Sequence, residues 1–322
     1  MYLAPDGDEV EIANAAATFL AEAMPVERLH GAAPADMNAD LRTKLGAMGW
    51  FALALPEALG GSGLTAVEFA LFFREVGRNC GPLDVLTQSL AALATDDAGL
   101  RASLAGGETG VALAVHDGQQ IRLLGAADAE YALEVSECGS RIVLLDKVPA
   151  EVRPSLDPSL SMRLVADFDG KAVGGDGRIW RMGALGAAAM LVGIAEATLE
   201  LIVEYAKLRE TFGKKIGSWQ AVRHPCADMA VRLEAARSQL WFAAAAMREG
   251  RSDASVHLDA AKLLANQAAL GNADSNIQLH GGIGVTSEHS AHLFLKHALV
   301  LSKLFGSKRA LLGRLLHAEV GD

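Results

Sequence analysis

The pattern of apolar and polar positions divides the chain into two helical stretches separated by a stretch of short strands. Near the start, Val10, Ile12, Ala15 and Phe19 recur at a helical spacing and predict a first helix. The second half carries longer patterns of the same period, joined by turns that contain glycine. Helices are predicted at 8–24, 38–48, 65–77, 85–95, 184–209, 219–249, 252–279, 288–304 and 308–318.

Between residues 109 and 180 the period changes from that of a helix to that of a strand. Short β-prone runs alternate with Gly, Asp and Pro. Strands are predicted at 111–115, 120–124, 132–135, 141–145 and 162–167. The predicted fold class is mainly α with a small β-domain: an N-terminal helical domain (1–108), a middle β-domain (109–180) and a C-terminal four-helix bundle (181–322).

Residues 184–203 are apolar enough to resemble a membrane span. They contain Glu196 and Glu200, four residues apart and therefore on one face of a helix. Two carboxylates inside a bilayer would be costly, so this segment is interpreted as a buried helix of a large core. No basic stretch of the secretory type lies in residues 1–9, and we expect a cytoplasmic protein without a membrane partner.

Charge and cysteine usage exclude several classes of function. The formal net charge is −10, and an acidic chain repels phosphate backbones, so nucleic acid is not an expected partner. Cys80, Cys138 and Cys226 lie far apart without a CxxC pair, which suits a reducing compartment and disfavours disulfides or zinc. The histidines at 289, 292 and 297 lack cysteine or carboxylate companions, so no metal site is expected.

Two segments of the second half combine residue types that suit a dinucleotide. In the first, Arg209 is followed by Phe212 and a glycine, so a planar guanidinium lies beside an aromatic ring and a bare backbone, which suits a pyrophosphate and a stacked base. In the second, Gln278 precedes Gly281 and Gly282, which permit close backbone approach. Taken singly, Arg209 could merely complement a helix dipole, and the glycines could merely cap a helix.

Four motifs in this order make the chain resemble the acyl-CoA dehydrogenases over nearly its whole length. They are Pro-Glu-x-x-Gly-Gly-x-Gly (56–63), Arg-x-x-Phe-Gly-Lys (209–214), Gln220 and Gln-x-x-Gly-Gly-x-Gly (278–284). The resemblance implies an FAD-dependent oxidoreductase that introduces an α,β double bond into an acyl-CoA thioester and usually reduces an electron-transfer flavoprotein. It also implies residues that hold the adenosine-pyrophosphate end of a neighbouring subunit's FAD: Arg209, Phe212, Gln220, Gln278, Gly281 and Gly282.

The chain departs from this family where the catalytic base is expected. By resemblance, the two customary positions of the glutamate fall at Phe305 and near Gly183, and neither can accept a proton. The family's Thr-Glu-Pro-x-x-Gly-Ser-Asp-like loop, which contacts the flavin ring, has no counterpart between residues 109 and 180, and this β-domain is reduced. No catalytic residue is therefore assigned to this chain.

The chain thus keeps the residues for a neighbour's FAD tail but lacks the base and the flavin-ring loop. This combination resembles one branch of the family, the heterotetramers of two unlike subunits best known from bacterial steroid side-chain breakdown. There one subunit supplies the base and a homologous partner completes the FAD site, and this chain is similar to the second kind. Two alternatives stay open: a self-sufficient homo-oligomer with an unusual base, and an inactive scaffold homologue. His280, beside the glycine pair, is interpreted as a packing or cofactor-contacting residue rather than a general base.

Overall fold

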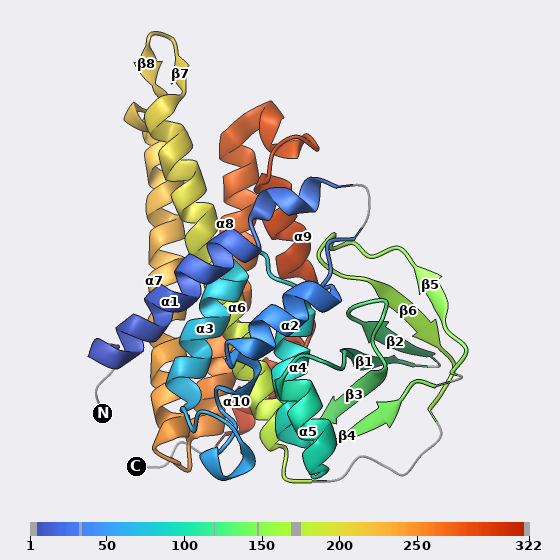
Figure 1. Ribbon diagram of the computed structural model, residues 1–322. Helices are drawn as coiled ribbons and strands as arrows, with labels where there is room; N and C mark the ends of the chain where they lie inside the picture. The colour runs from blue at the N-terminus through green and yellow to red at the C-terminus, as the bar shows by residue number, and fades with distance from the viewer. Residues whose placement is uncertain (1–4, 32–33, 119, 147, 169–174, 319–322) are drawn as a thin grey trace. The chain divides into compact units, whose positions relative to one another are not determined.

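The computed structural model describes residues 5–31, 34–118, 120–146, 148–168 and 175–318 (Figure 1). By internal contacts the chain forms two compact units. The first comprises residues 1–30, 70–80 and 184–322, and the second comprises 31–69 and 81–183. The α-helices are α1 (Gly7–Ala23), α2 (Ala39–Ala47), α3 (Ala66–Arg78), α4 (Leu83–Ala94), α5 (Ala98–Ala105), α6 (Arg178–Leu208), α7 (Gln220–Arg248), α8 (Ala254–His280), α9 (Ala291–Leu301) and α10 (Lys308–His317).

The second unit contains the main sheet, with six strands in the order β4-β3-β1-β2-β6-β5. Strands β1 and β3 run parallel, and the other neighbours are antiparallel. The sheet buries a core that includes Ile121, Leu123 and Val165, while helix α4 packs against β1. The strands are β1 (Val111–Asp117), β2 (Gln120–Leu124), β3 (Tyr131–Ser136), β4 (Gly139–Leu144), β5 (Glu151–Arg153) and β6 (Met162–Val165).

The first unit is a bundle built around α6, α7 and α8. Helix α7 packs along α8, and the buried Asn272 of α8 donates hydrogen bonds to the carbonyl oxygens of Ala195 in α6 (3.2 Å) and Met229 in α7 (3.1 Å). The two carbonyls belong to different helices, so one carboxamide links three members of the bundle. A two-stranded hairpin, β7 (Glu210–Thr211) and β8 (Lys214–Lys215), extends from the end where α6 meets α7 (Figure 1).

Helices α3 and α6 cross in direct backbone contact. A Cβ atom added to Gly77 would lie 2.0 Å from the carbonyl oxygen of Met190, and one added to Gly193 would lie 2.0 Å from that of Arg74. No larger side chain can occupy either position without moving a helix. These two glycines therefore determine how closely the apolar helix α6 approaches α3.

Helix α6 is long and apolar enough, by length and composition alone, to cross a membrane, but 72% of its most apolar window is buried within the protein. The carboxylates of Glu196 and Glu200 both accept hydrogen bonds from Arg78 of α3, at 3.2 Å and 3.0 Å. Burial raises the pKa of Glu196, and the nearby guanidinium groups of Arg74 and Arg78 oppose this rise. The interpretation of this segment as a buried core helix agrees with these contacts.

The predicted layout of helices, small sheet and helices is confirmed, with corrections to four elements. Helix α6 begins at Arg178 rather than at residue 184, because Gly183 and the residues around it continue the helix. Helix α9 is shorter than predicted, Ala291–Leu301 in place of 288–304. Helix α5 and strand β5 were not predicted.

Candidate functional site

The Arg-x-x-Phe-Gly-Lys motif (209–214) forms the hairpin between α6 and α7, with Phe212 and Gly213 at its tip. Phe212 and Gly213 both have positive φ angles, 51° and 74°, which suit a two-residue turn between paired strands. The Phe212 side chain is 94% exposed. The ring therefore lies at the tip of the turn, in a backbone conformation that residues other than glycine seldom adopt, and no core surrounds it.

Backbone contacts hold the hairpin while leaving Arg209 available. The amide of Ile216 donates to the carbonyl of Arg209 (2.9 Å), and the Ile216 side chain is buried. Lys215 donates to the carbonyl of Leu208 (3.0 Å) and pairs with Glu210 (2.7 Å). The guanidinium of Arg209 is exposed and has no ion pair or hydrogen bond with the residues that the structure describes.

The Gln-x-x-Gly-Gly-x-Gly motif (278–284) lies at the end of α8, where Gln278 is exposed on the last turn. A Cβ atom at Gly281 or Gly282 would meet nothing within 4 Å, so the backbone there faces open space, and Gly281 has a φ of 68°. Gly284 differs, because a Cβ atom there would lie 2.6 Å from the carbonyl oxygen of Ile277. The first two glycines thus leave the backbone accessible, and the third permits local packing.

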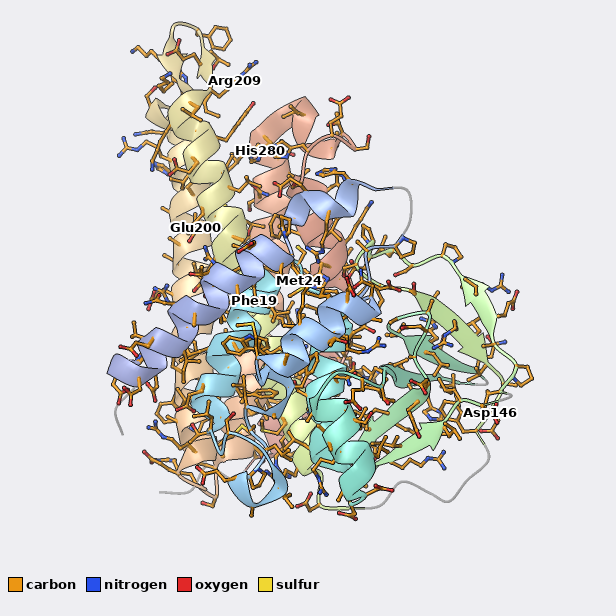
Figure 2. All side chains as sticks on the ribbon, in the orientation of Figure 1. Phe19, Met24, Asp146, Glu200, Arg209 and His280 are labelled. Atoms are coloured by element: carbon orange, nitrogen blue, oxygen red, sulfur yellow. The ribbon has the colours of Figure 1, made fainter. Side chains whose placement is uncertain are left out.

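An aromatic contact brings the two motifs together. The ring of Tyr205 lies 4.4 Å from that of His280, which in turn lies 4.4 Å from the ring of His289. Tyr205 precedes Arg209 by one helical turn, and His280 follows Gln278 by two residues, so the ends of α6 and α8 are neighbours (Figure 2). Sequence reasoning missed Tyr205, although its spacing of one turn from Arg209 was a usable signal.

Gln220 is the first residue of α7, directly after Trp219, which is 40% exposed and lies under the ammonium group of Lys214 at 5.7 Å. The Gln220 side chain is exposed, and in the described ranges no hydrogen bond ties it to the other two motifs. The structure therefore brings the last turn of α6 next to the Gln278 segment through Tyr205 and His280, and it places Gln220 at the other end of the hairpin connection.

His280 is built as a neutral, buried residue. Its Nδ1 lies 2.8 Å from the carbonyl oxygen of Asn276, which assigns the proton to Nδ1. Its Nε2 is buried and has no hydrogen-bond partner among the described residues, and burial lowers the pKa of His280. A nitrogen enclosed in this way cannot reach a substrate, which supports a packing role for His280.

The position at which the resemblance places the base, residue 305, holds a buried phenyl ring. Phe305 is 5% exposed and has a φ of 53°, and Ser307, two residues on, accepts a hydrogen bond from the amide of Ala310 (3.3 Å) as the N-cap of α10. The adjoining Arg314 makes a bidentate pair with Asp259, with both distances 2.7 Å. That carboxylate is therefore engaged, and Gly183, the other customary position, lies inside α6.

The turn at residues 56–63 closes on itself within the second unit. The amides of Ser62 and Gly63 donate to the carbonyls of Ala52 (3.0 Å) and Leu55 (2.9 Å), and a Cβ atom at Gly61 would lie 2.1 Å from the carbonyl oxygen of Leu55. Gly61 thus has a local packing reason, whereas a Cβ atom at Gly60 would meet nothing within 4 Å. Within the described part of the chain, no three His, Cys, Asp or Glu side chains are grouped so that they could hold a metal ion.

Comparison with known proteins identifies relatives at the level of sequence. The model of the acyl-CoA dehydrogenase C-terminal domain matches residues 180–318, and that of the N-terminal domain matches residues 6–99. Acyl-CoA dehydrogenase IpdE2 of Mycobacterium tuberculosis is 34% identical over 280 residues, which cover 85% of this chain and 84% of IpdE2. Acyl-CoA dehydrogenase FadE34 of the same organism is 36% identical over 275 residues, 79% of this chain but only 38% of FadE34.

Solved structures of two-chain complexes are also similar. A chain of the Tcur3481–Tcur3483 steroid ACAD (G363A variant) is 26% identical, with a TM-score of 0.82 and 96% of each chain covered. A chain of the ChsE4–ChsE5 complex from Mycobacterium tuberculosis has the same fold, with a TM-score of 0.82 at 21% identity over 99% of this chain and 100% of that one.

Proposed function

The chain belongs to the acyl-CoA dehydrogenase family, and we propose that it is one subunit of a heteromeric, FAD-dependent enzyme, in which it supplies the adenosine-pyrophosphate half of a cofactor site to a homologous partner. The observation that carries the proposal is the exposed surface formed by Arg209, Phe212, Gln278 and the Gly281–Gly282 backbone. Phe212 is 94% exposed, the side chains of Arg209 and Gln278 are exposed without a hydrogen bond or ion pair to a described residue, and the backbone at Gly281 and Gly282 faces open space.

The residues present fit the tail of FAD. A free guanidinium can form two parallel hydrogen bonds with a pyrophosphate, an exposed phenyl ring offers a face to a base or sugar, and an open glycine backbone permits close approach. The carboxamides of Gln220 and Gln278 can donate and accept hydrogen bonds toward ribose or adenine. Bound FAD would supply a flavin that accepts the β-hydride of the acyl thioester.

The proton chemistry is assigned to the partner. Phe305 and Gly183 stand where the resemblance places the base and neither can accept the α-proton, so we assign the carboxylate base to the other chain. The two-chain complexes among the similar structures support a heteromer. One of them is a steroid ACAD, which supports a steroid-type acyl-CoA as the substrate class. An electron-transfer flavoprotein is the proposed acceptor, and the cytoplasm is the proposed location.

The test is the flavin content of the purified complex. The chain is co-expressed with a homologous dehydrogenase-like chain encoded beside it that has an intact glutamate in the base segment, and FAD is measured per complex. Arg209→Ala should lower FAD retention by about tenfold or more, because removal of a charge-assisted pair costs about 1.5–3 kcal/mol. Arg309→Ala, at an exposed arginine of α10, is the matched control and should retain full flavin.

Two further results bear on the division of labour. Phe305→Glu alone should restore little activity, because a carboxylate at this buried position would still lack the flavin-ring contacts. Undiminished FAD in the Arg209→Ala complex would refute the half-site.

A further inference from the structure

Three aromatic rings meet where the end of α8 lies beside the end of α6. The ring of Tyr205, in the last turn of α6, lies 4.4 Å from that of His280, the last residue of α8 (Figure 2). The ring of His289 also lies 4.4 Å from that of His280. The loop between the two histidines, residues 281–288, carries the Gly281–Gly282 backbone. Ring contacts therefore close this loop at its base and hold the base against α6.

Hydrogen bonds keep the two histidines of this contact neutral. Nδ1 of His289 accepts from the amide of Ala291 (3.1 Å), the first residue of α9, so it carries no proton. Nδ1 of His280 donates to the carbonyl oxygen of Asn276 (2.8 Å), and Nε2 is buried without an acceptor among the described residues. A second proton on His289 would break the bond to Ala291, and one on His280 would bury an unpaired N–H group.

Two further histidines lie around the same loop. His30 donates from Nδ1 to the carbonyl oxygen of Ser287 (2.7 Å), and its Nε2 lies 3.0 Å from the hydroxyl oxygen of Ser290. The ring of His292 meets that of His30 edge-on at 6.5 Å, and both of its nitrogens are buried without a partner in the described part of the chain. Four imidazoles thus gather at this end of the bundle, and protonating any one of them places a positive charge beside another.

Burial and neighbouring positive charge act in the same direction on these rings. Burial is the largest cause that lowers the pKa of His280, and positive charge on His289 lowers it further. The pKa of His289 is lowered by burial and then by His30. The pKa of His292 is lowered by burial, and then by Lys296, His30 and His289. The cluster therefore resists protonation as long as it stays packed.

Carboxylates that could compensate a proton are engaged or exposed. Glu204, on the last turns of α6, is paired with Lys207 (2.6 Å). Glu288, in the loop itself, is exposed. Among the residues that the structure describes, no carboxylate forms a hydrogen bond or ion pair with the four imidazoles, so an added proton finds no counter-ion in the packed cluster.

We propose that Tyr205, His280 and His289 form an aromatic clasp that positions the Gly281–Gly282 backbone beside the end of α6, and that the clasp opens when its imidazoles take up protons. The purpose of the clasp rests on the proposed function: it would hold the glycine backbone and the Arg209 segment in place for one FAD tail, and acid would release that tail. The clasp itself belongs to the single chain and can be tested without FAD.

The size of the pH effect follows from the ordinary pKa of an exposed imidazole. That pKa is about 6.5 in the open loop and lower in the clasp, so the stability of the clasp is complete above pH 6.5 and is lost as pH falls through the lowered pKa. At pH 5.5 opening should be about tenfold more favourable than at pH 7.5 for each imidazole that stays neutral in the clasp.

Hydrogen–deuterium exchange of the full chain, followed by mass spectrometry, measures this opening. After correction for the intrinsic pH dependence of exchange, peptides that cover residues 281–290 should exchange about tenfold faster or more at pH 5.5 than at pH 7.5. The double variant His280→Phe/His289→Phe keeps both rings but cannot take up these protons, and it should show no such rise. His317→Phe, at an exposed histidine of α10, is the matched control and should keep the rise.

Two results would overturn the pH dependence of the clasp. One is a rise of the parent's size in the double variant. The other is an equal rise in peptides of α4, in the second unit, because that would show general unfolding in acid.

Two variants of Tyr205 test the contact with α6. Tyr205→Phe keeps the ring and should exchange like the parent at pH 7.5. Tyr205→Ala should exchange about two- to tenfold faster, the range expected for the loss of one aromatic pair. Equal exchange in the two variants would overturn the role of Tyr205.

FAD measurements on the complex separate the clasp from the half-site. Tyr205→Ala should lower FAD retention at pH 7.5, and Tyr205→Phe should preserve it. If Arg209→Ala loses FAD but Tyr205→Ala does not, the half-site stands and the positioning role of the clasp is refuted. If the exchange results hold but Arg209→Ala retains FAD, the half-site fails and the clasp stands as a pH-sensitive contact.

Discussion

Lys262 is a buried amine whose removal should stabilise the protein at neutral pH. It is 0% exposed, and its Nζ donates to Oδ1 of Asn266 (2.9 Å) and to the carbonyl oxygen of Leu301 (3.3 Å), at the end of α9. Among the residues that the structure describes, no carboxylate accepts a hydrogen bond from this amine. Burial lowers the pKa of Lys262 from 10.5 to about 7, since the charged form has left water without a counter-ion.

The size of the effect follows from this pKa. Lys262 binds a proton near pH 10.5 in the unfolded chain but only near pH 7 in the folded chain. The free energy of unfolding is therefore unaffected by this group above pH 10.5 and decreases as the pH falls from 10.5 toward 7. At about 1.4 kcal/mol per pKa unit, the cost reached at pH 7 is about 4 kcal/mol. Lys262→Met removes this cost but loses two hydrogen bonds of about 1 kcal/mol each, so the variant should gain about 2 kcal/mol at pH 7.

The assay is urea unfolding followed by circular dichroism at pH 7, 8 and 9. Between pH 7 and pH 9 the unfolding free energy of the parent should rise by about 2 kcal/mol relative to that of Lys262→Met, because only the parent carries an amine whose pKa is lowered by folding. Lys303→Met, at an exposed lysine, is the control and should leave the pH profile unchanged. Parallel profiles for the parent and Lys262→Met would show that the ammonium group is solvated or paired, and would refute the reasoning.

Three further predictions concern the helices and the His280 contact. Gly193→Ala should destabilise the fold by more than about 3 kcal/mol or prevent folding, because its Cβ atom would lie 2.0 Å from a backbone oxygen. Gly313→Ala is the control: a Cβ atom there meets open space, so the substitution should stabilise α10 by up to about 1 kcal/mol. Thermal unfolding compares the two variants. Asp97→Ala should cost about 1 kcal/mol in the same melts, because Asp97 accepts from the amides of Gly99 (2.8 Å) and Leu100 (3.0 Å), and an unchanged midpoint would show that this cap is dispensable. Burial lowers the pKa of His280, so the stability that its neutral form contributes should be lost as pH falls below about 6.5 and through the folded pKa. The unfolding free energy of His280→Phe should therefore change less between pH 7 and pH 5 than that of the parent. An identical change in the two proteins would contradict this.

Long periodic elements could be predicted closely from the sequence. The helix predicted at 219–249 is α7 (Gln220–Arg248), and the one predicted at 252–279 is α8 (Ala254–His280). Their apolar stripes are long, so the helical period stands out from local noise. Strand β5 (Glu151–Arg153) could not be predicted, because all three residues are exposed and the strand exists only through its pairing with β6.

Residue order alone predicts the residues of the half-site, which stay a prediction, but it does not predict how the two segments are arranged. The motifs around Arg209 and Gln278 follow from residue order alone, yet nothing in that order shows that Tyr205 and His280 stack and bring the ends of α6 and α8 together. Such a contact depends on how helices pack, which is a tertiary property. The start of α6 was predicted six residues late, at residue 184, whereas the helix begins at Arg178 and continues through Gly183.

The stoichiometry of flavin is the most direct test of the proposed half-site. The chain purified alone should bind little FAD and should not dehydrogenate an acyl-CoA, and the complex with a base-bearing homologue should contain one FAD for each pair of unlike chains. One FAD per chain in the isolated protein, together with turnover of an acyl-CoA, would contradict the account.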